Sequence, residues 1–237
     1  MIRIAAVGDV HLGSEGRFHR RPELDRLGEH ADLLLLAGDL SNFGRDDEAR
    51  VVAREFSGLP VPVVAVLGNH DHHAGRPEEF AEVLRGAGIT VLEGRSTAID
   101  TPGGRVGIAG VKGFGGGFLG GEGSAFGEAE MKAFIGHSRE SAEALENALH
   151  ALDADHRVAL THYAPCPDTL EGEPAELFPF LGSQYLAAAI DAGRVDLAVH
   201  GHAHHGSEFG ATPGGVPVRN VAEPVLGAAY RVYHLGA

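Results

Sequence analysis

The sequence predicts an α/β fold. Short apolar runs of strand length alternate with helical patterns through the first part of the chain, an order typical of a sheet with helices outside it. Two of the runs, Asp32–Ala37 and Val61–Leu67, are apolar on both faces, as in strands buried on both sides. The chain has 237 residues without a shift in composition or an internal repeat. We therefore expect a single domain over residues 1–237.

The N-terminal elements follow from apolar spacing and from the residues at their ends. Pro22 suits the first position of a helix, and the acidic residues after Arg45 suit the first turn of another. In chain order, we predict a strand at Ile2–Val7, a helix at Pro22–His30, a strand at Asp32–Ala37, a helix at Asp46–Phe56, a strand at Val61–Leu67 and a helix at Pro77–Arg85.

The rest of the chain has a different pattern. Thr-Pro-Gly-Gly at 101–104 separates two short strand patterns, as in a hairpin. Gly113–Gly127 is glycine-rich and loop-like, and the leucines of Glu128–Leu152 fall on one helical face. The remaining predicted strands are Ser96–Asp100, Arg105–Gly110, Arg157–Thr161, Asp196–Val199 and two closing antiparallel strands, Val216–Val221 and Tyr230–His234.

Charge and composition narrow the classes of function. The net charge of −14 argues against broad attraction to long nucleic acid or to an anionic membrane. Cys166 is the only cysteine, so there is no internal disulfide, which fits a reducing cytoplasm. Met1–Asp9 has the pattern of a strand and not of a signal peptide. No apolar run approaches the ~20 residues that span a bilayer, so we expect a cytoplasmic protein with no membrane contact.

Five short segments place histidine, aspartate or asparagine just after a predicted strand. Ligands of open α/β sheets bind beyond the carboxyl ends of strands, so these groups can meet in one place. In an extended chain, residues i and i+2 point to the same side, which lets each Asp-x-His or His-x-His pair hold one ion. Carboxylate, imidazole and amide oxygen suit Mn, Fe or Zn ions. The segments are Gly8-Asp9-Val10-His11, Gly38-Asp39, Gly68-Asn69-His70-Asp71, Thr161-His162 and Gly201-His202-Ala203-His204.

This ordered set resembles the calcineurin-like metallophosphoesterases, and the resemblance runs from Asp9 to His204. It implies a two-sheet α/β/β/α sandwich with helices on both outer faces. It also implies two divalent metal ions, with Mn favoured among Mn, Fe, Zn and Co. The first metal would be held by Asp9, His11, Asp39 and His204, and the second by Asp39, Asn69, His162 and His202.

The resemblance also implies roles in a reaction. Asp39 would bridge the two metals, and His70 would stand beside the scissile phosphate without binding metal. Two metals ~3.5–4 Å apart can clamp the attacking and leaving oxygens and acidify a bridging water, so that hydroxide attacks phosphorus. Two dications with the carboxylates of Asp9 and Asp39 leave a local charge of about +2, which would attract phosphate despite the acidic surface. Asp71 is either the orienting partner of His70 or the cap of the following turn.

Several neighbouring residues leave alternatives open. His200 and His202 form a rival ligand pair. The Gly-His-x-His pattern at 201–204 favours His202 with His204 and leaves His200 as a residue that orients other ligands. Gly113–Gly127 is a plain loop or a lid. The more ordinary interpretation is preferred for the remaining residues: loop histidines for His72, His73 and His205, a packed thiol for Cys166, turn formers for Ser41 and Asn42, a surface lysine for Lys112 and a solvated loop for Arg17, Arg20 and Arg21.

We therefore expect a phosphoesterase acting on a phosphodiester or a small phosphorylated metabolite. The alternative is a scaffold that kept this fold and lost its chemistry. The complete set of seven metal-ligand positions, together with His70, favours the enzyme. Metal storage is a third interpretation, and it leaves His70 without a role. Native metal, oligomeric state and monoester or diester preference have no signal in the sequence.

Overall fold

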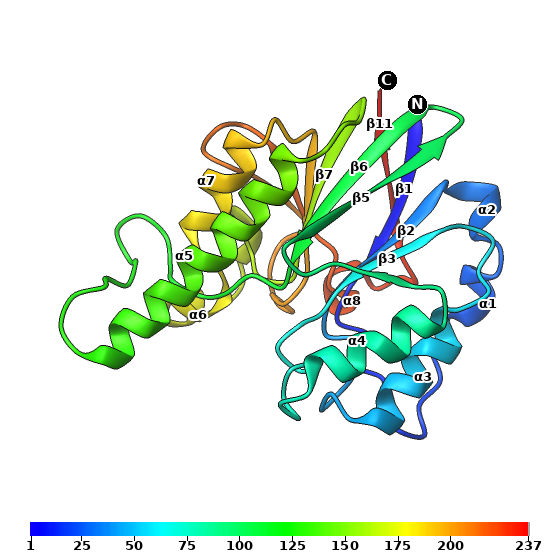
Figure 1. The fold of residues 1–237 in the computed structure, drawn as a ribbon, viewed down its shortest axis with the longest axis horizontal. Coiled ribbons are helices and arrows are strands. Elements are labelled where there is room, and N and C mark those ends of the chain that lie inside the picture. Colours follow the sequence, from blue (N-terminus) through cyan, green and yellow to red (C-terminus); the bar gives the residue numbers. More distant parts are fainter. Residues whose placement is uncertain (237) are drawn as a thin grey trace.

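The computed structural model describes residues 1–236, which form two β-sheets that pack face to face between two layers of helices (Figure 1). The first sheet has the strand order β11-β1-β2-β3-β4, and the second has the order β5-β6-β7-β8-β10-β9. Helices α1 to α4 lie against the first sheet, and helices α5 and α7 lie against the second (Figure 1). The predicted α/β/β/α sandwich is thereby confirmed.

The first sheet is built mainly from the N-terminal part of the chain. Its strands β1, β2, β3 and β4 run parallel, and β11 pairs antiparallel with β1. The strands are β1 (Ile2–Val7), β2 (Leu33–Ala37), β3 (Val63–Val66), β4 (Thr90–Val91) and β11 (Arg231–Leu235). The helices beside them are α1 (Arg21–Leu24), α2 (Leu27–His30), α3 (Asp46–Phe56) and α4 (Pro77–Gly86).

The second sheet has a parallel centre and antiparallel edges. Strands β6, β7, β8 and β10 are parallel, whereas β5 and β9 close the two edges antiparallel. The strands are β5 (Arg95–Thr101), β6 (Gly104–Val111), β7 (His156–Thr161), β8 (Leu197–His200), β9 (Phe209–Ala211) and β10 (Pro217–Asn220). The helices of this half are α5 (Ala129–His150), α6 (Phe178–Leu181), α7 (Gln184–Ala192) and α8 (Glu223–Leu226), with single 3₁₀ turns at Asp168–Leu170 and Ala175–Leu177.

The hydrophobic core has three layers, which follow from the period of two along each strand. In β2, Leu34 and Leu36 pack toward α3 and α4, whereas Leu33 and Leu35 face the second sheet. The outer face of the second sheet packs on α5 and α7 through residues such as Leu145. A strand such as β2 is therefore buried on both sides, as its apolar sequence predicted.

Two predicted elements differ from the structure. Pro22–His30 is not one helix, because the backbone of Arg26 leaves the helical region between α1 and α2. The closing strands do not pair with each other, since they belong to different sheets. The strand within Val216–Val221 lies parallel to β8 and antiparallel to β9, and the strand within Tyr230–His234 joins β1. Helix α7 and the short strands β4 and β9 were not predicted.

Candidate metal centre

The five histidine- and aspartate-bearing segments meet at one end of the two sheets. Each follows a strand: β1 leads to Asp9, β2 to Asp39, β3 to Asn69, β7 to His162 and β8 to His202. The sheets are tied together there, because the N–H of Gly8 donates to the carbonyl of Val221 at 2.8 Å and the N–H of Glu223 donates to the Gly8 carbonyl at 2.9 Å.

The backbone at this point is strained. Asp9, His11, Asp39 and His202 have φ angles of 57°, 44°, 49° and 73°, a left-handed region that L residues with side chains rarely occupy. They are four of the five non-glycine residues with positive φ in the described part of the chain. Such strain persists only where the surrounding structure imposes it, and it is concentrated at functional sites.

One group of donor atoms surrounds a first position. Atoms of Asp9, His11, Asp39 and His204 all lie within 4.8 Å of one another. Nε2 of His204 is 3.0 Å from Oδ1 of Asp9 and 3.4 Å from Nε2 of His11, which is itself 3.8 Å from Oδ2 of Asp39. Imidazole nitrogens and carboxylate oxygens that converge in this way match the ligand chemistry of a divalent metal.

A second group shares Asp39 with the first. Atoms of Asp39, His162 and His202 also lie within 4.8 Å of one another. Nε2 of His162 is 3.3 Å from Oδ1 of Asp39 and 3.0 Å from Oδ1 of Asn69, so the asparagine amide oxygen joins this group. The structure therefore brings all seven predicted ligands together, with the Asp39 carboxylate between the two groups.

Three glycines allow this approach, because a larger residue would occupy the space of a ligand. A Cβ atom on Gly68 would collide with the carboxylate of Asp39, and one on Gly201 would collide with that of Asp9. Gly38 has a φ of +82°, and its Cβ would lie 2.7 Å from Nδ1 of His162. The glycines before Asp39, Asn69 and His202 are thus required for close packing of neighbouring loops.

Hydrogen bonds orient several of these side chains. Nδ1 of His162 lies 2.8 Å from the carbonyl oxygen of Ala37, so Nδ1–H donates to the carbonyl and Nε2 points toward Asp39 and Asn69. The N–H of His202 donates to both carboxylate oxygens of Asp9 at 3.0 Å. Contacts of this kind commonly set the direction in which metal ligands point.

The two carboxylates need a positive partner. Asp9 and Asp39 are 3% and 1% exposed, and within residues 1–236 only histidines lie within 4 Å of their oxygens as cationic partners. Burial opposes the charge of Asp39, but the adjacent His162 ring still holds its pKa below the ordinary value, and Asp39 in turn raises the pKa of His162 to about 9. Buried carboxylates with converging imidazole nitrogens fit divalent ions, which would supply the missing charge.

His70 lies beside this centre. Its Nε2 is 3.9 Å from Oδ2 of Asp39, and its side chain is 43% exposed. Nδ1 is 2.8 Å from the carbonyl oxygen of Asn42, so Nδ1–H donates to that carbonyl and Nε2 faces the open side of the site. His70 belongs to neither metal-binding group, which fits a residue that meets substrate.

The carboxylate of Asp71 binds the loop after β2 and the backbone of Gly68, which corrects both roles expected for it, the partner of His70 and the cap of the following turn. Its carboxylate is completely buried and accepts hydrogen bonds from the backbone of Leu40 (3.2 Å), Ser41 (2.9 Å) and Gly68 (2.8 Å), and from the Ser41 hydroxyl (2.7 Å). The carbonyl of Asn42 takes the orienting role. Sequence could not identify that partner, because a backbone carbonyl is present at every position.

The neighbouring candidates have ordinary structural roles. His200 is buried with Nε2 at 2.8 Å from the hydroxyl of Thr169, and burial lowers its pKa to about 3. It is not in either group of possible metal ligands, so the structure favours His202 with His204 over the rival pair. Cys166 is a buried thiol, as expected. His205 and His73 are exposed loop residues.

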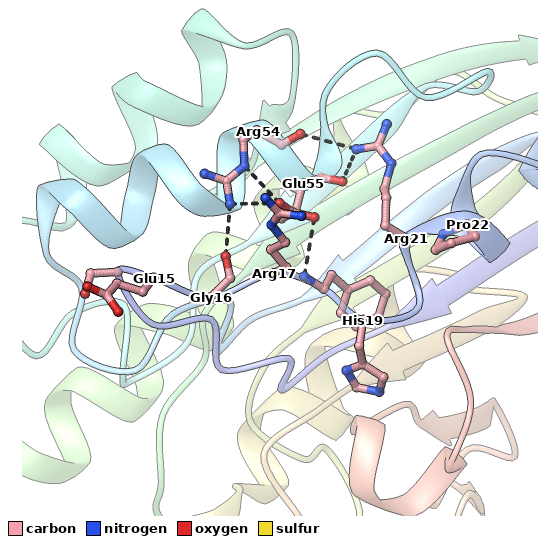
Figure 2. A pocket seen from close by; sticks show the side chains of 10 residues that line it. Glu15, Gly16, Arg17, His19, Arg21, Pro22, Arg54 and Glu55 are labelled. Atoms are coloured by element: carbon pink, nitrogen blue, oxygen red, sulfur yellow. Dashed lines mark hydrogen bonds and ion pairs between the residues drawn. The ribbon is translucent and has the colours of Figure 1, made fainter.

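The N-terminal arginines mostly bind protein groups. Arg17 and Arg21 line a cavity of about 760 Å³ together with Arg54, and Figure 2 shows these side chains. Arg21 donates to backbone carbonyls of Arg54 and Glu55, Arg54 pairs with the Glu55 carboxylate at 2.9 Å, and Arg20 pairs with a glutamate of α8 at 3.3 Å. Arg17 is exposed. None of the proposed site residues lines this cavity.

The glycine-rich segment is anchored to the protein. Gly116 and Gly117 donate to the carbonyls of Pro179 and Gly182 at 2.7 and 2.9 Å, and Phe118 packs against a small buried cluster. These contacts favour the plain loop over a lid. Lys112, which precedes the segment, is 7% exposed, so the prediction of a surface lysine is wrong.

Comparison with known proteins agrees with this geometry. A family model described as calcineurin-like phosphoesterase matches residues 2–206. A search among curated proteins gives no match. Among solved structures, phosphopantetheinyl hydrolase from Mycobacterium tuberculosis is similar, with a TM-score of 0.70, 19% identity, and coverage of 92% of this chain and 88% of that chain.

Two further structures share the fold. The protein TT1561 of Thermus thermophilus has a TM-score of 0.58 at 18% identity, and the match covers 99% of both chains. A putative 5′-nucleotidase from Staphylococcus aureus has a TM-score of 0.58 at 18% identity, and the match covers 92% of this chain but 48% of that one. The family match spans most of the chain and includes every converging strand end, so this protein belongs to the calcineurin-like phosphoesterase family.

Proposed function

We propose that this protein is a dinuclear, metal-dependent phosphoesterase that hydrolyses a phosphodiester or a small phosphorylated metabolite. The observation that carries the proposal is the position of Asp39, whose two oxygens face two separate groups of donor atoms: His11 with Oδ2, and His162 with Oδ1. A buried carboxylate between two such groups suits a bridging ligand. We favour Mn, although the same donor set accepts Fe, Zn or Co.

The position of each site residue indicates its proposed role in the reaction. Asp9, His11, Asp39 and His204 would hold one ion, and Asp39, Asn69, His162 and His202 the other. When bound, the ions would polarise the phosphoryl group and acidify the attacking water. His70 would donate a proton from Nε2 to the leaving oxygen, because its Nδ1–H is already engaged by the Asn42 carbonyl.

Two observations support the proposed class of substrate: the acidic net charge of the chain, and the activities named for two proteins that share its fold. The acidic chain disfavours long polyanions such as nucleic acid. The fold is shared with a phosphopantetheinyl hydrolase and a putative 5′-nucleotidase, and both names fit small phosphorylated compounds. Across residues 1–236, none of the helices combines the length and apolar character required to cross a bilayer, and we propose a cytoplasmic location.

The test uses protein stripped of metal and reloaded with Mn. Bound metal is measured by mass spectrometry, and turnover is measured with a chromogenic phosphodiester and the matching monoester. We expect two ions per chain and Mn-dependent turnover, with both lost in Asp39→Ala. Wild-type protein that binds two ions and turns over neither ester would support the alternative, a binding scaffold. Protein that binds no metal would contradict both interpretations.

A further inference from the structure

Lys112 is a buried cation next to the metal centre. It follows β6 and is one of two lysines in the chain; the other, Lys132, is exposed on α5. Lys112 is 7% exposed, and lysines are almost never buried to this extent unless their charge has a partner. Its position therefore needs an explanation.

The protein compensates this charge mainly from a distance, through the carboxylate of Glu93. Nζ donates one hydrogen bond, to the carbonyl of Gly113 at 2.9 Å, whereas an ammonium has three donors. Within residues 1–236, no carboxylate oxygen lies within 4.0 Å of Nζ. The side chain of Glu93 accepts from the backbone N–H of Lys112 at 3.0 Å instead. The rings of Phe114 and Tyr163 lie 5.0 and 4.9 Å from Nζ, which holds the ammonium in place but leaves its other donors free.

The ammonium lines a cavity of about 380 Å³ formed with His72, Glu93, His137, Glu140 and Ser141. This cavity adjoins the metal centre in two ways. His72 lies two residues beyond His70 in the same loop. The Tyr163 ring, which contacts Nζ, also stacks on His202 with 4.3 Å between ring centres. The ring of Tyr163 thus contacts both the Lys112 ammonium and the proposed ligand His202.

We propose that Lys112 binds a second acidic group of the substrate, a carboxylate or a phosphate, separated from the scissile phosphoester by a short spacer. This inference deepens the proposed function and rests on it for the position of the first phosphate. Glu93 and Glu140 line the same cavity, so their charge disfavours an extended polyanion there. The site would select small substrates with one additional acidic group.

The test separates binding from turnover. Calorimetry on Mn-loaded and metal-free protein compares butyl phosphonate with carboxybutyl phosphonate and butane diphosphonate, none of which is hydrolysed. Kinetics compares p-nitrophenyl butyl phosphate with its carboxybutyl and phosphonobutyl counterparts. In the binding assay, we expect wild-type protein to bind at least one acidic compound at a roughly tenfold lower concentration than the neutral one. In the kinetic assay, at least one acidic ester should reach half-maximal rate at a roughly tenfold lower concentration than the neutral ester. This factor is the one expected for a charge-assisted hydrogen bond.

Two variants make the assignment specific. Lys112→Met should abolish the preference, so that the acidic and neutral compounds perform equally. Lys112→Arg should keep part of the preference, since the charge remains. Lys132→Met is the matched control and should behave as wild type. Thermal unfolding of each variant shows whether it folds, and Lys112→Gln replaces Lys112→Met if the methionine variant does not.

The possible results test the Lys112 site and the proposed phosphoesterase function separately. Wild-type protein without a preference for either acidic compound would overturn the Lys112 site, whatever its turnover. An equal loss of binding for neutral and acidic compounds in Lys112→Met would also overturn it and indicate a structural role. A preference in binding that Lys112→Met removes, in a protein that hydrolyses none of the esters, would leave the Lys112 site standing and overturn the proposed function. The carboxylate and phosphonate arms distinguish the two acidic groups.

Discussion

The carboxylate of Asp71 lies 2.9 Å from the backbone nitrogen of Ser41 and joins the loop after β3 to the loop after β2. The same carboxylate accepts from the backbone of Leu40 and of Gly68. Asp39 and Asn69, which stand in the two metal-binding groups, are carried by these loops. Asp71 therefore positions these two proposed metal ligands through the backbone, and it contacts neither solvent nor substrate because it is fully buried.

Asp71→Ala should consequently destabilise the protein and weaken metal binding together. Removing the carboxylate leaves several buried donors unsatisfied, which costs about 3 kcal/mol of unfolding free energy. Urea unfolding of the metal-free protein measures the first effect, and metal content after dialysis measures the second. Asp100→Ala is the control, since the Asp100 side chain is 85% exposed. Lost turnover with normal stability and metal content would instead mean that Asp71 acts through His70.

His70→Ala should separate metal binding from chemistry. Because His70 is in neither metal-binding group, the variant should retain the metal content of the wild type. Loss of its proton donation should lower kcat by about 10²–10⁴-fold. Metal analysis and turnover of a chromogenic ester on the same sample check both statements. His73→Ala, an exposed histidine of the same loop, should have little effect, and an equal loss in both variants would contradict the role of His70.

Glycine to alanine changes should have opposite effects at two positions. In Gly68→Ala, the new Cβ would collide with the carboxylate and backbone nitrogen of Asp39, so we expect a loss of about 1–3 kcal/mol and of bound metal. In Gly136→Ala, within α5, no atom lies within 4 Å of the new Cβ, so helix propensity should stabilise the protein by about 0.5–1 kcal/mol. Chemical unfolding measures both. A Gly68→Ala variant as stable as the wild type would contradict the close packing.

Cys166 should resist thiol reagents in the native protein. The side chain is fully buried, and burial raises the pKa of its thiol against the opposing effect of Thr169, so little reactive thiolate is present near neutral pH. A chromogenic disulfide reagent at pH 8 should label Cys166 slowly in native protein and completely in guanidinium chloride. Rapid labelling of the native protein would show that the Asp168–Leu170 turn opens readily.

The sequence predicted much of this protein because its signals are local. Short apolar runs defined β1, β2 and β3, and the spacing of Asp9 with His11 indicated that both could reach one ion. The strand ends that carry Asp9 and Asp39 could be predicted to meet, since β1 and β2 are parallel and end at the same edge of one sheet. The resemblance to a known family then implied the second sheet, which the structure confirms.

Other features had weak or misleading local signals. Helix α7 lies in a run of alanines without a clear polar face, and strands β4 and β9 have two and three residues, too few for a periodic pattern. The strand β10 gave no indication of its direction, because it is parallel to β8 on one side and antiparallel to β9 on the other. Pairing partners are decided by packing and not by strand sequence.

By itself, then, the sequence determined the α/β class, most of the strands and the residue types that can bind two metals, because strand period and ligand spacing act over a few neighbouring residues. The tertiary structure alone decided three relationships: the Asn42 carbonyl as the partner of His70, the backbone of Leu40 and Ser41 as partners of Asp71, and the burial of Lys112 against Tyr163. The first two bring together groups about 30 residues apart, and the third joins residues that are 51 positions apart. These contacts join loops at the ends of neighbouring strands, β2 with β3 and β6 with β7, and they depend on how those loops pack. Backbone carbonyls and amides carry no mark of residue type from which their partners could be foreseen.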